Sequence, residues 1–347
     1  MSESTTTAAD AGTRPPAIAL PGRWRAGATR MWGSPWRTFV LRRLVHLGVS
    51  LWVLVTAAFV MIHLVPGDPV RAALGMTAPE ELVSARREAL GLNDPILVQY
   101  VDYLRGLAGG DLGTSLTSNL PVSQVITDRF PATAVLAVLA LGVAVAVALP
   151  VGVGMAILTR GGRRRGGELA FTSTSVFLAA IPEFLLAVGL VYVFAVQLMW
   201  FPVAGRSGAA SYVLPVAALA VGPAAVLARI LRVEMLTVLG QDYIRTARAK
   251  RLPPRLVHLR HALPNALTAT LTLGGLLLTA MVAGTVLVEN VFAWPGLGST
   301  MVSSILQRDY PVVQGIVLLY GVLVLLVTLV VDVLLAVLDP RSTIRES

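Results

Sequence analysis

The 347-residue sequence contains no cysteine, a single lysine and four histidines, and only 14% of its residues are charged. The absence of cysteine excludes disulfides, thiolate metal sites and a cysteine nucleophile. Four histidines are too few to favour a histidine-rich metal site. Lys250 is followed by Arg251, so the chain lacks the Gly-Lys-Ser/Thr ending of a phosphate-binding loop. Neither HExxH nor GxSxG occurs. The sequence therefore predicts a chain that is not an enzyme and binds no cofactor.

Apolar residues dominate instead: 55% of the sequence is hydrophobic and the mean hydropathy is +0.74. A helix needs about 20 predominantly apolar residues to cross a bilayer, and six segments approach or exceed that length. They are residues 44–65, 132–158, 169–199, 213–236, 266–288 and 315–338. The third contains Pro182, so we expect a kink there. The sequence thus predicts an all-α integral membrane protein with six transmembrane helices in a lipid bilayer.

The basic residues are distributed unevenly between the loops. Nineteen of the 28 arginine and lysine residues lie in residues 1–43, 159–168, 237–265 and 339–347. The alternate segments 66–130, 200–212 and 289–313 hold only seven. Because cytoplasmic loops carry such an excess, we expect both termini and the 237–265 loop in the cytoplasm. The net charge of +9 lies between apolar spans and no nucleic-acid motif accompanies it, so we expect no nucleic-acid partner.

Polar segments flank and interrupt these spans. Residues 1–36 are rich in small and polar residues without apolar periodicity, which predicts a disordered cytoplasmic N-terminus. Residues 66–130 form an extracytoplasmic insertion with two helix-start signals, at residues 77–80 and 93–95. We expect a small helical platform there, which is either a docking surface or a structural cap. The membrane domain then covers residues 37–341, and a tail follows at 342–347.

The segment 241–267 is the longest polar run of the C-terminal half and carries six basic residues against one acid, Asp242. Four leucines within it follow helical steps of four, three and four residues: Leu252, Leu256, Leu259 and Leu263. We expect two short helices joined by a turn near Arg251, with the leucine stripe left free for another molecule. The alternative is a basic loop on the membrane surface without a partner.

Several short motifs occur in order along the chain. They are PGDP at 66–69, GDLG at 110–113, RFPAT at 129–133, DYIRTARAK at 242–250, RHALPNAL at 260–267, ENVFAWPGLG at 289–298, RDYPVVQG at 308–315 and DPR at 339–341. Each motif is weak alone, but the ordered set is specific and covers residues 39–341. It resembles the permease subunits of ABC importers, in particular the first permease of the dipeptide and oligopeptide branch.

The resemblance implies a multi-pass subunit of a bacterial inner membrane with several partners. These are a second, similar permease, two ATPase subunits that bind ATP and Mg, and an extracytoplasmic substrate-binding protein. In this family the 237–265 loop holds the coupling helix, which transmits closure of the ATPases to the membrane. The implied coupling residues are Arg245, Thr246, Ala247, Ala249, Lys250, Arg251, Leu252, Leu256, Leu259 and Leu263.

One residue of this loop departs from the family pattern. Glycine usually stands where this chain has Arg251. Glycine permits a left-handed turn, a conformation that costs a non-glycine residue about 1–2 kcal/mol. The turn is therefore either built differently here or strained.

Ionisable residues within or beside the spans are costly unless they are paired or face water. Glu183 either lines a translocation path, where it would meet the amino group of a peptide, or hydrogen-bonds to a neighbouring helix, or simply lies near the membrane interface. Glu289 lies in a stretch that resembles the family's external gate, and it either supports that gate or contacts substrate. Arg229, Arg232 and Glu234 either form a salt-bridged cluster beside the loop or extend to the membrane interface.

Two other classes of protein would also have several membrane spans. A stand-alone secondary transporter or channel usually has polar groups at mid-membrane and an internal repeat, and no clear repeat occurs here. A non-transporting membrane scaffold is the other alternative. The motifs favour a permease subunit of an ATP-driven importer of dipeptides or oligopeptides, and co-purification with ATPase subunits separates the three classes.

Overall fold

The computed structural model describes residues 34–64, 69–75, 77–89, 91–162 and 164–338. Within these ranges the chain is helical, and its one β-type contact is an isolated bridge between Thr114 and Pro121. The prediction of an all-α fold is confirmed for this part of the chain. The predicted disorder of residues 1–36 and the tail at 342–347 fall outside the described residues, except that α1 already begins at Ser34.

The helices of the described chain are separated by short connections, and two π-helical segments, Val191–Gln197 and Val257–Ala262, continue α7 and α10. The helix bounds are α1 Ser34–Leu64, α2 Pro69–Leu74, α3 Glu80–Ala89, α4 Ile96–Ala108, α5 Val122–Thr159, α6 Arg165–Ala180, α7 Glu183–Leu190, α8 Val213–Leu239, α9 Asp242–Ala249, α10 Pro254–Leu256, α11 Leu263–Val291, α12 Leu297–Leu306 and α13 Tyr310–Leu338.

Four stretches of the described chain are long and apolar enough to cross a membrane: Leu41–Met61, Val122–Gly162, Ala209–Leu239 and Tyr310–Val333. A fifth stretch is broken, because α6 and the helix that starts with α7 meet at an angle of 94°. The kink expected at Pro182 is thus a complete break. Ile181 is extended, with ψ 121°, since the proline ring disfavours the helical region for the residue before it.

The second predicted span is longer than expected at its beginning. The last residues of the predicted insertion, from Val122 onward, and the span predicted at 132–158 form one helix, α5, in spite of Pro131. A proline removes one intrahelical hydrogen bond, but the residues on both sides of it are held by packing. Val122 and Ile126 lie in a cluster with α12 and α13, and Leu136 lies in the main core.

α8 lies at the centre of the bundle. Its membrane-length stretch is 61% buried inside the molecule, whereas those of α1 and α13 are 11% buried. α5 packs along α8 and buries every fourth residue: Leu136, Ala140, Ala144, Ala148, Gly152 and Ala156. Small side chains let membrane helices approach closely. The α5–α8 pair is therefore the core against which the other helices pack.

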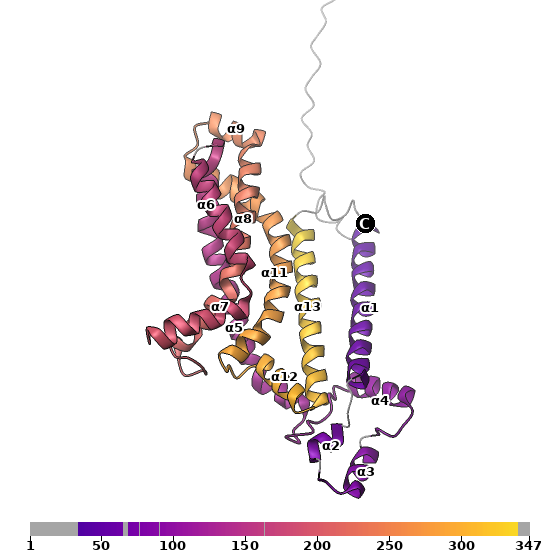
Figure 1. Ribbon diagram of the computed structural model, residues 1–347. Helices are drawn as coiled ribbons and strands as arrows, with labels where there is room; N and C mark the ends of the chain where they lie inside the picture. The colour runs from indigo at the N-terminus through magenta and orange to yellow at the C-terminus, as the bar shows by residue number, and fades with distance from the viewer. Residues whose placement is uncertain (1–33, 65–68, 76, 90, 163, 339–347) are drawn as a thin grey trace, which may run out of the picture.

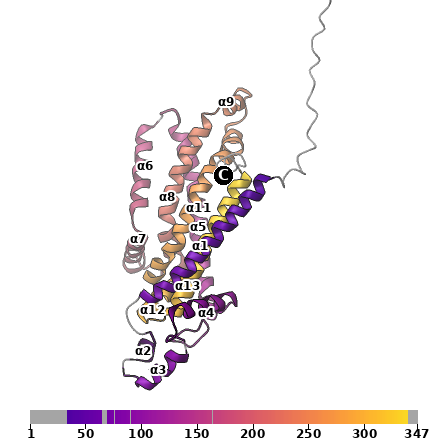
Figure 2. The same cartoon turned by 90° about the vertical axis from the view of Figure 1, so that its right-hand side faces the viewer.

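The two ends of the bundle carry different elements (Figure 1). α9 lies at the end where α1 begins and α13 finishes, and the insertion helices α2, α3 and α4 lie at the opposite end. α1 and α13 pack side by side (Figure 2), and an ion pair joins Arg43 of α1 to Asp332 of α13. Segments from the two ends of the sequence therefore form one edge of the bundle.

Candidate functional site

The 237–265 loop folds as two short helices joined by a tight turn. α9 ends at Ala249, and Arg251 adopts a left-handed conformation with φ +53°. The backbone N–H of Leu252 donates to Ala247 O (3.3 Å), and that of Arg251 donates to Arg248 O (2.8 Å). These two bonds define a Schellman motif, whose left-handed position usually holds glycine. The turn is therefore the left-handed one, and Arg251 occupies it at a steric cost.

One face of this loop packs on the bundle. Ile244 and Ala247 of α9, together with Val257, are at most 8% exposed. They belong to one hydrophobic cluster with Met235 and Leu239 of α8. The loop is therefore held to α8 by its own apolar side chains.

Most of the predicted coupling residues lie on the opposite, outer face of the loop. Among those that precede the leucine stripe, Ala247 is the exception, since it is buried. The exposed ones are Arg245, Thr246, Ala249, Lys250 and Arg251. Two large apolar side chains share this face with them, Tyr243 at 45% exposure and Leu259 at 56%. The outer face thus combines positive charge with apolar surface, as a protein-binding surface does.

The predicted leucine stripe is divided between the two faces. Leu252 and Leu263 pack on the cluster beneath the loop. Leu256 is half-buried and Leu259 is exposed. The prediction of a stripe left free for another molecule is therefore wrong for the first two. Leu252 precedes α10 and belongs to the turn, whereas Leu263 follows a π-helical segment, in which hydrogen bonds join residues five apart. Val257 and Ala262 consequently share the buried face.

Positive charge on the loop comes from its arginines and Lys250, and His258 adds none. Burial, and secondly the charge of Arg248, lower the pKa of His258. This imidazole is therefore neutral at neutral pH. Asp242 forms an exposed ion pair with Arg245 (3.1 Å) within α9, which leaves the other basic residues of the outer face in excess.

We expect Arg251→Gly to stabilise the chain by up to about 1 kcal/mol, because glycine adopts the left-handed conformation without a steric cost. Thermal unfolding of the purified chain in detergent measures the change. The matched control is Arg255→Gly, at an exposed position within α10, where glycine costs up to about 1 kcal/mol. Equal destabilisation by both variants would mean that the Arg251 side chain makes a stabilising contact that outweighs its strain.

Beside the loop, a buried arginine joins three helices. Arg232 of α8 is 6% exposed, forms an ion pair with Glu168 of α6 (2.7 Å) and donates from Nε to Thr159 Oγ1 of α5 (3.0 Å). Within the described chain, Arg229 and Glu234 form no ion pair. Of the two alternatives for these three residues, the salt-bridged cluster does not form, because Arg232 and Glu234 are two apart on the helix and do not face each other.

At the other end of the bundle, Glu289 of α11 is fully buried. Its carboxylate accepts hydrogen bonds from Thr133 Oγ1 (2.6 Å) and from the backbone N–H groups of Gly298 (2.6 Å) and Ser299 (3.2 Å). The N–H groups belong to the first turn of α12, whose positive end favours a carboxylate. A Cβ at Gly296 would lie 2.5 Å from Glu289 Oε2. Glu289 therefore ties α11, α12 and α5 together and presents no surface to a solute in this conformation.

A second buried carboxylate, Asp309, attaches the insertion to the bundle. Asp309 is 1% exposed and accepts hydrogen bonds from Ser115 Oγ (2.5 Å), Leu116 N–H (3.0 Å) and Thr117 Oγ1 (2.7 Å). Our sequence reasoning did not single out this residue, although it lies in one of the motifs. Its partners are more than 190 residues away in the chain, so no local pattern reveals the contact.

Glu183 lies at the break between α6 and α7. It is the first residue of α7, is half-buried, and rests on Gly284 of α11, where a Cβ would overlap its carboxylate. Among the residues that the structure describes, Glu183 forms no hydrogen bond and no ion pair. The same residues contain no group of acids and histidines that could hold a metal ion. Glu183 is thus an unpaired carboxylate at a helix break, separate from the network of Glu289.

A bundle of membrane-length helices, with a packed loop at one end and an insertion at the other, is the fold of a multi-pass membrane protein. The chain belongs to the family described as the binding-protein-dependent transport system inner membrane component, whose model matches residues 148–344. The model of the N-terminal part of this membrane component matches residues 37–137. The chain is therefore a bacterial inner-membrane permease subunit of an ABC importer, a family that works with ATPase subunits and a substrate-binding protein.

Relatives of known function match along nearly their whole length. The glutathione transport system permease protein GsiC of Salmonella typhimurium is 39% identical over 303 residues, which cover 87% of this chain and 97% of that protein. GsiC of Pectobacterium atrosepticum is 38% identical over 302 residues, with the same coverage. Among solved structures, the inward-facing MetNI methionine ABC transporter aligns with a TM-score of 0.53 and 20% identity, covering 62% of this chain and 97% of that one. This likeness supports the fold, and the family does not favour a stand-alone transporter.

Proposed function

We propose that the chain is one of two permease subunits of an ATP-driven importer of short peptides, a class that includes the tripeptide glutathione. The observation that carries this proposal is the 39% identity to a glutathione permease across 97% of its length. The ordered motifs of the dipeptide and oligopeptide branch support the same substrate class. Within that class, the substrate-binding protein selects the solute.

Six transmembrane spans make up the proposed topology: α1, α5, the broken unit of α6 and α7, α8, α11 and α13. Both termini and the 237–265 loop are in the cytoplasm in this proposal. The excess of arginine on these segments supports it. So does the common position of α9, the start of α1 and the end of α13 at one end of the bundle.

The proposed partners are a second, homologous permease, two ATPase subunits at the outer face of the loop, and a substrate-binding protein at the insertion. ATP and Mg would be bound by the ATPase subunits. Closure of these subunits would displace the loop, and Ile244 and Val257, buried between the loop and α8, would pass the movement into the bundle. The break at Pro182 offers a point where one span changes direction without loss of further hydrogen bonds.

Two carboxylates have different proposed roles in transport. Glu183, unpaired at the helix break, suits the amino group of a peptide, because an ionised carboxylate in a membrane protein is stable only when it is paired or faces water. Glu289 is proposed as a support of the external gate, since its three hydrogen bonds fix the start of α12.

Reconstitution of the four kinds of subunit in proteoliposomes tests the proposed function. We expect ATP-dependent uptake of a labelled dipeptide, with competition from glutathione, and co-purification of the ATPases. Uptake without the ATPases, or none of either solute, would contradict it. Vesicles that contain the chain without the ATPase subunits test the orientation, because the chain has no native cysteine. A membrane-impermeant maleimide should label Thr246→Cys only in inside-out vesicles and Ser84→Cys only in right-side-out vesicles.

A further inference from the structure

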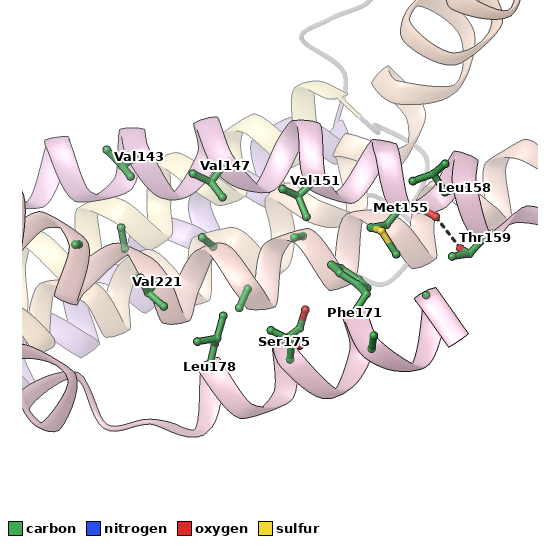
Figure 3. Close-up of a pocket in the computed structure, with 18 of the residues that line it drawn as sticks. Val143, Val147, Val151, Met155, Leu158, Thr159, Phe171, Ser175, Leu178 and Val221 are labelled. Atoms are coloured by element: carbon green, nitrogen blue, oxygen red, sulfur yellow. Dashed lines mark hydrogen bonds between the residues drawn. The ribbon is translucent and has the colours of Figure 1, made fainter. Parts of the chain in front are cut away.

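A cavity of about 600 Å³ lies between α5, α6 and α8, apart from both the 237–265 loop and Glu289. Figure 3 shows side chains of α5 on one side of it and side chains of α6, among them Phe171 and Leu178, on the other. Val143, Val147 and Val151 of α5 line the cavity and are 40–47% exposed. The cavity is therefore open at the surface of the bundle.

The shape of this cavity suits a hydrocarbon chain. Its lining on α5 extends from Val143 to Thr159. At a rise of 1.5 Å per residue this distance is about 24 Å, and the hydrocarbon of one leaflet is about 15 Å deep. Apart from two threonines, one serine and one arginine, its lining side chains are apolar or absent. An acyl chain that lies along α5 would contact apolar side chains over its whole length.

Positive charge is confined to one end of this cavity. Arg164 lines it where α6 begins, and Arg165 is the next residue; both are exposed. Within the described chain neither forms an ion pair. The acid nearest in the sequence, Glu168, is neutralised by Arg232. Arg160 donates a hydrogen bond to Leu239 O (3.4 Å).

A second cavity of the same bundle lacks this charge. It has a volume of about 410 Å³, lies between α5, α8, α11 and α13, and is lined by apolar residues and one threonine. Val145 of α5 lines this second cavity, and Val151, less than two helical turns further along α5, lines the first. The pair offers a comparison in which the apolar environment is similar and only the first cavity has basic residues at its end.

We propose that the cavity between α5, α6 and α8 binds an anionic phospholipid, with an acyl chain along α5 and the phosphate at Arg164 and Arg165. α6 begins at the end of the bundle where α9 lies (Figure 1). The lipid would accordingly come from the leaflet at that end. Basic residues at the mouth of an apolar site between membrane helices are a known arrangement for anionic headgroups.

Native mass spectrometry of the full chain in detergent tests this proposal, with phosphatidylglycerol and phosphatidylcholine of identical acyl chains. One basic residue near a membrane surface contributes about fivefold to the affinity for anionic lipid, so two contribute about thirtyfold. We expect the wild type to prefer phosphatidylglycerol by about that factor. The double variant Arg164→Gln/Arg165→Gln should lose the preference, and Val151→Phe should weaken the binding of both lipids. Inorganic phosphate alone should not bind detectably.

Val145→Phe is the matched control, since it places the same side chain in the cavity without arginines and should leave lipid binding unchanged. Equal binding of both lipids by the wild type, or unchanged binding in the arginine variant, would overturn the proposal. A benzophenone attached to the new thiol of the Val147→Cys variant shows which molecule covers the cavity in the assembled importer, a phospholipid or a second permease subunit. We expect photocrosslinks to phospholipid, whereas crosslinks to a second permease subunit would show that protein covers the cavity.

Discussion

Leu259→Asp should reduce ATP-coupled uptake at least about thirtyfold while the chain still folds and inserts. Leu259 is 56% exposed on the outer face of the 237–265 loop. A carboxylate there faces solvent in the free chain, so it should cost little stability. In the proposed complex the same carboxylate would be buried against an ATPase subunit. Loss of a central apolar contact typically costs 2 kcal/mol or more, which corresponds to the factor of about thirty.

Three measurements on this variant separate coupling from folding: uptake in proteoliposomes, ATP hydrolysis, and recovery of the ATPase subunits with the purified chain. Leu259→Met is the control, since it keeps an apolar side chain of similar volume and should transport like the wild type. Normal uptake by Leu259→Asp would show that this face of the loop does not contact the ATPases. Loss of the variant from the membrane would show instead that Leu259 is needed for folding.

Some features of this loop follow from the sequence, and others depend on how the loop packs. The two helices of the polar run follow from local signals, proline and helical spacing. The turn at Arg251 follows from the family pattern, which usually has glycine at that position. The division of the leucine stripe does not, because the π-helical turn at Val257–Ala262 changes which residues face the bundle. That turn depends on packing against α8, which no local pattern encodes.

The same distinction holds for the rest of the molecule. Apolar run length and helix-start signals were enough to predict an all-helical membrane protein and the helices of the insertion. The break at Pro182 was predicted only as a kink, since a proline alone does not determine how far the next helix turns away. The contacts of Arg232 with Glu168 and of Asp309 with Ser115 join distant parts of the chain. Such pairs need a three-dimensional structure to be seen.

Glu289→Ala should destabilise the chain by about 3 kcal/mol or more. Thr133, Gly298 and Ser299 each lose the acceptor of a hydrogen bond, and each donor left without a partner in a buried site costs about 1–3 kcal/mol. The start of α12 also loses the negative charge that its N–H groups face. The stability of Glu289→Gln should lie between that of Glu289→Ala and that of the wild type, because an amide keeps one acceptor oxygen but lacks the charge.

Thermal unfolding of the purified chain in detergent measures this loss, and Glu234→Ala is the matched control. Glu234 is half-buried on α8 and, within the described chain, has neither an ion pair nor a hydrogen bond, so its removal should change the free energy of unfolding by less than about 0.5 kcal/mol. Similar stability of Glu289→Ala and Glu234→Ala would contradict a structural role for Glu289. If uptake were lost as well while stability stayed unchanged, the carboxylate would have to act on the solute, in a conformation that exposes it.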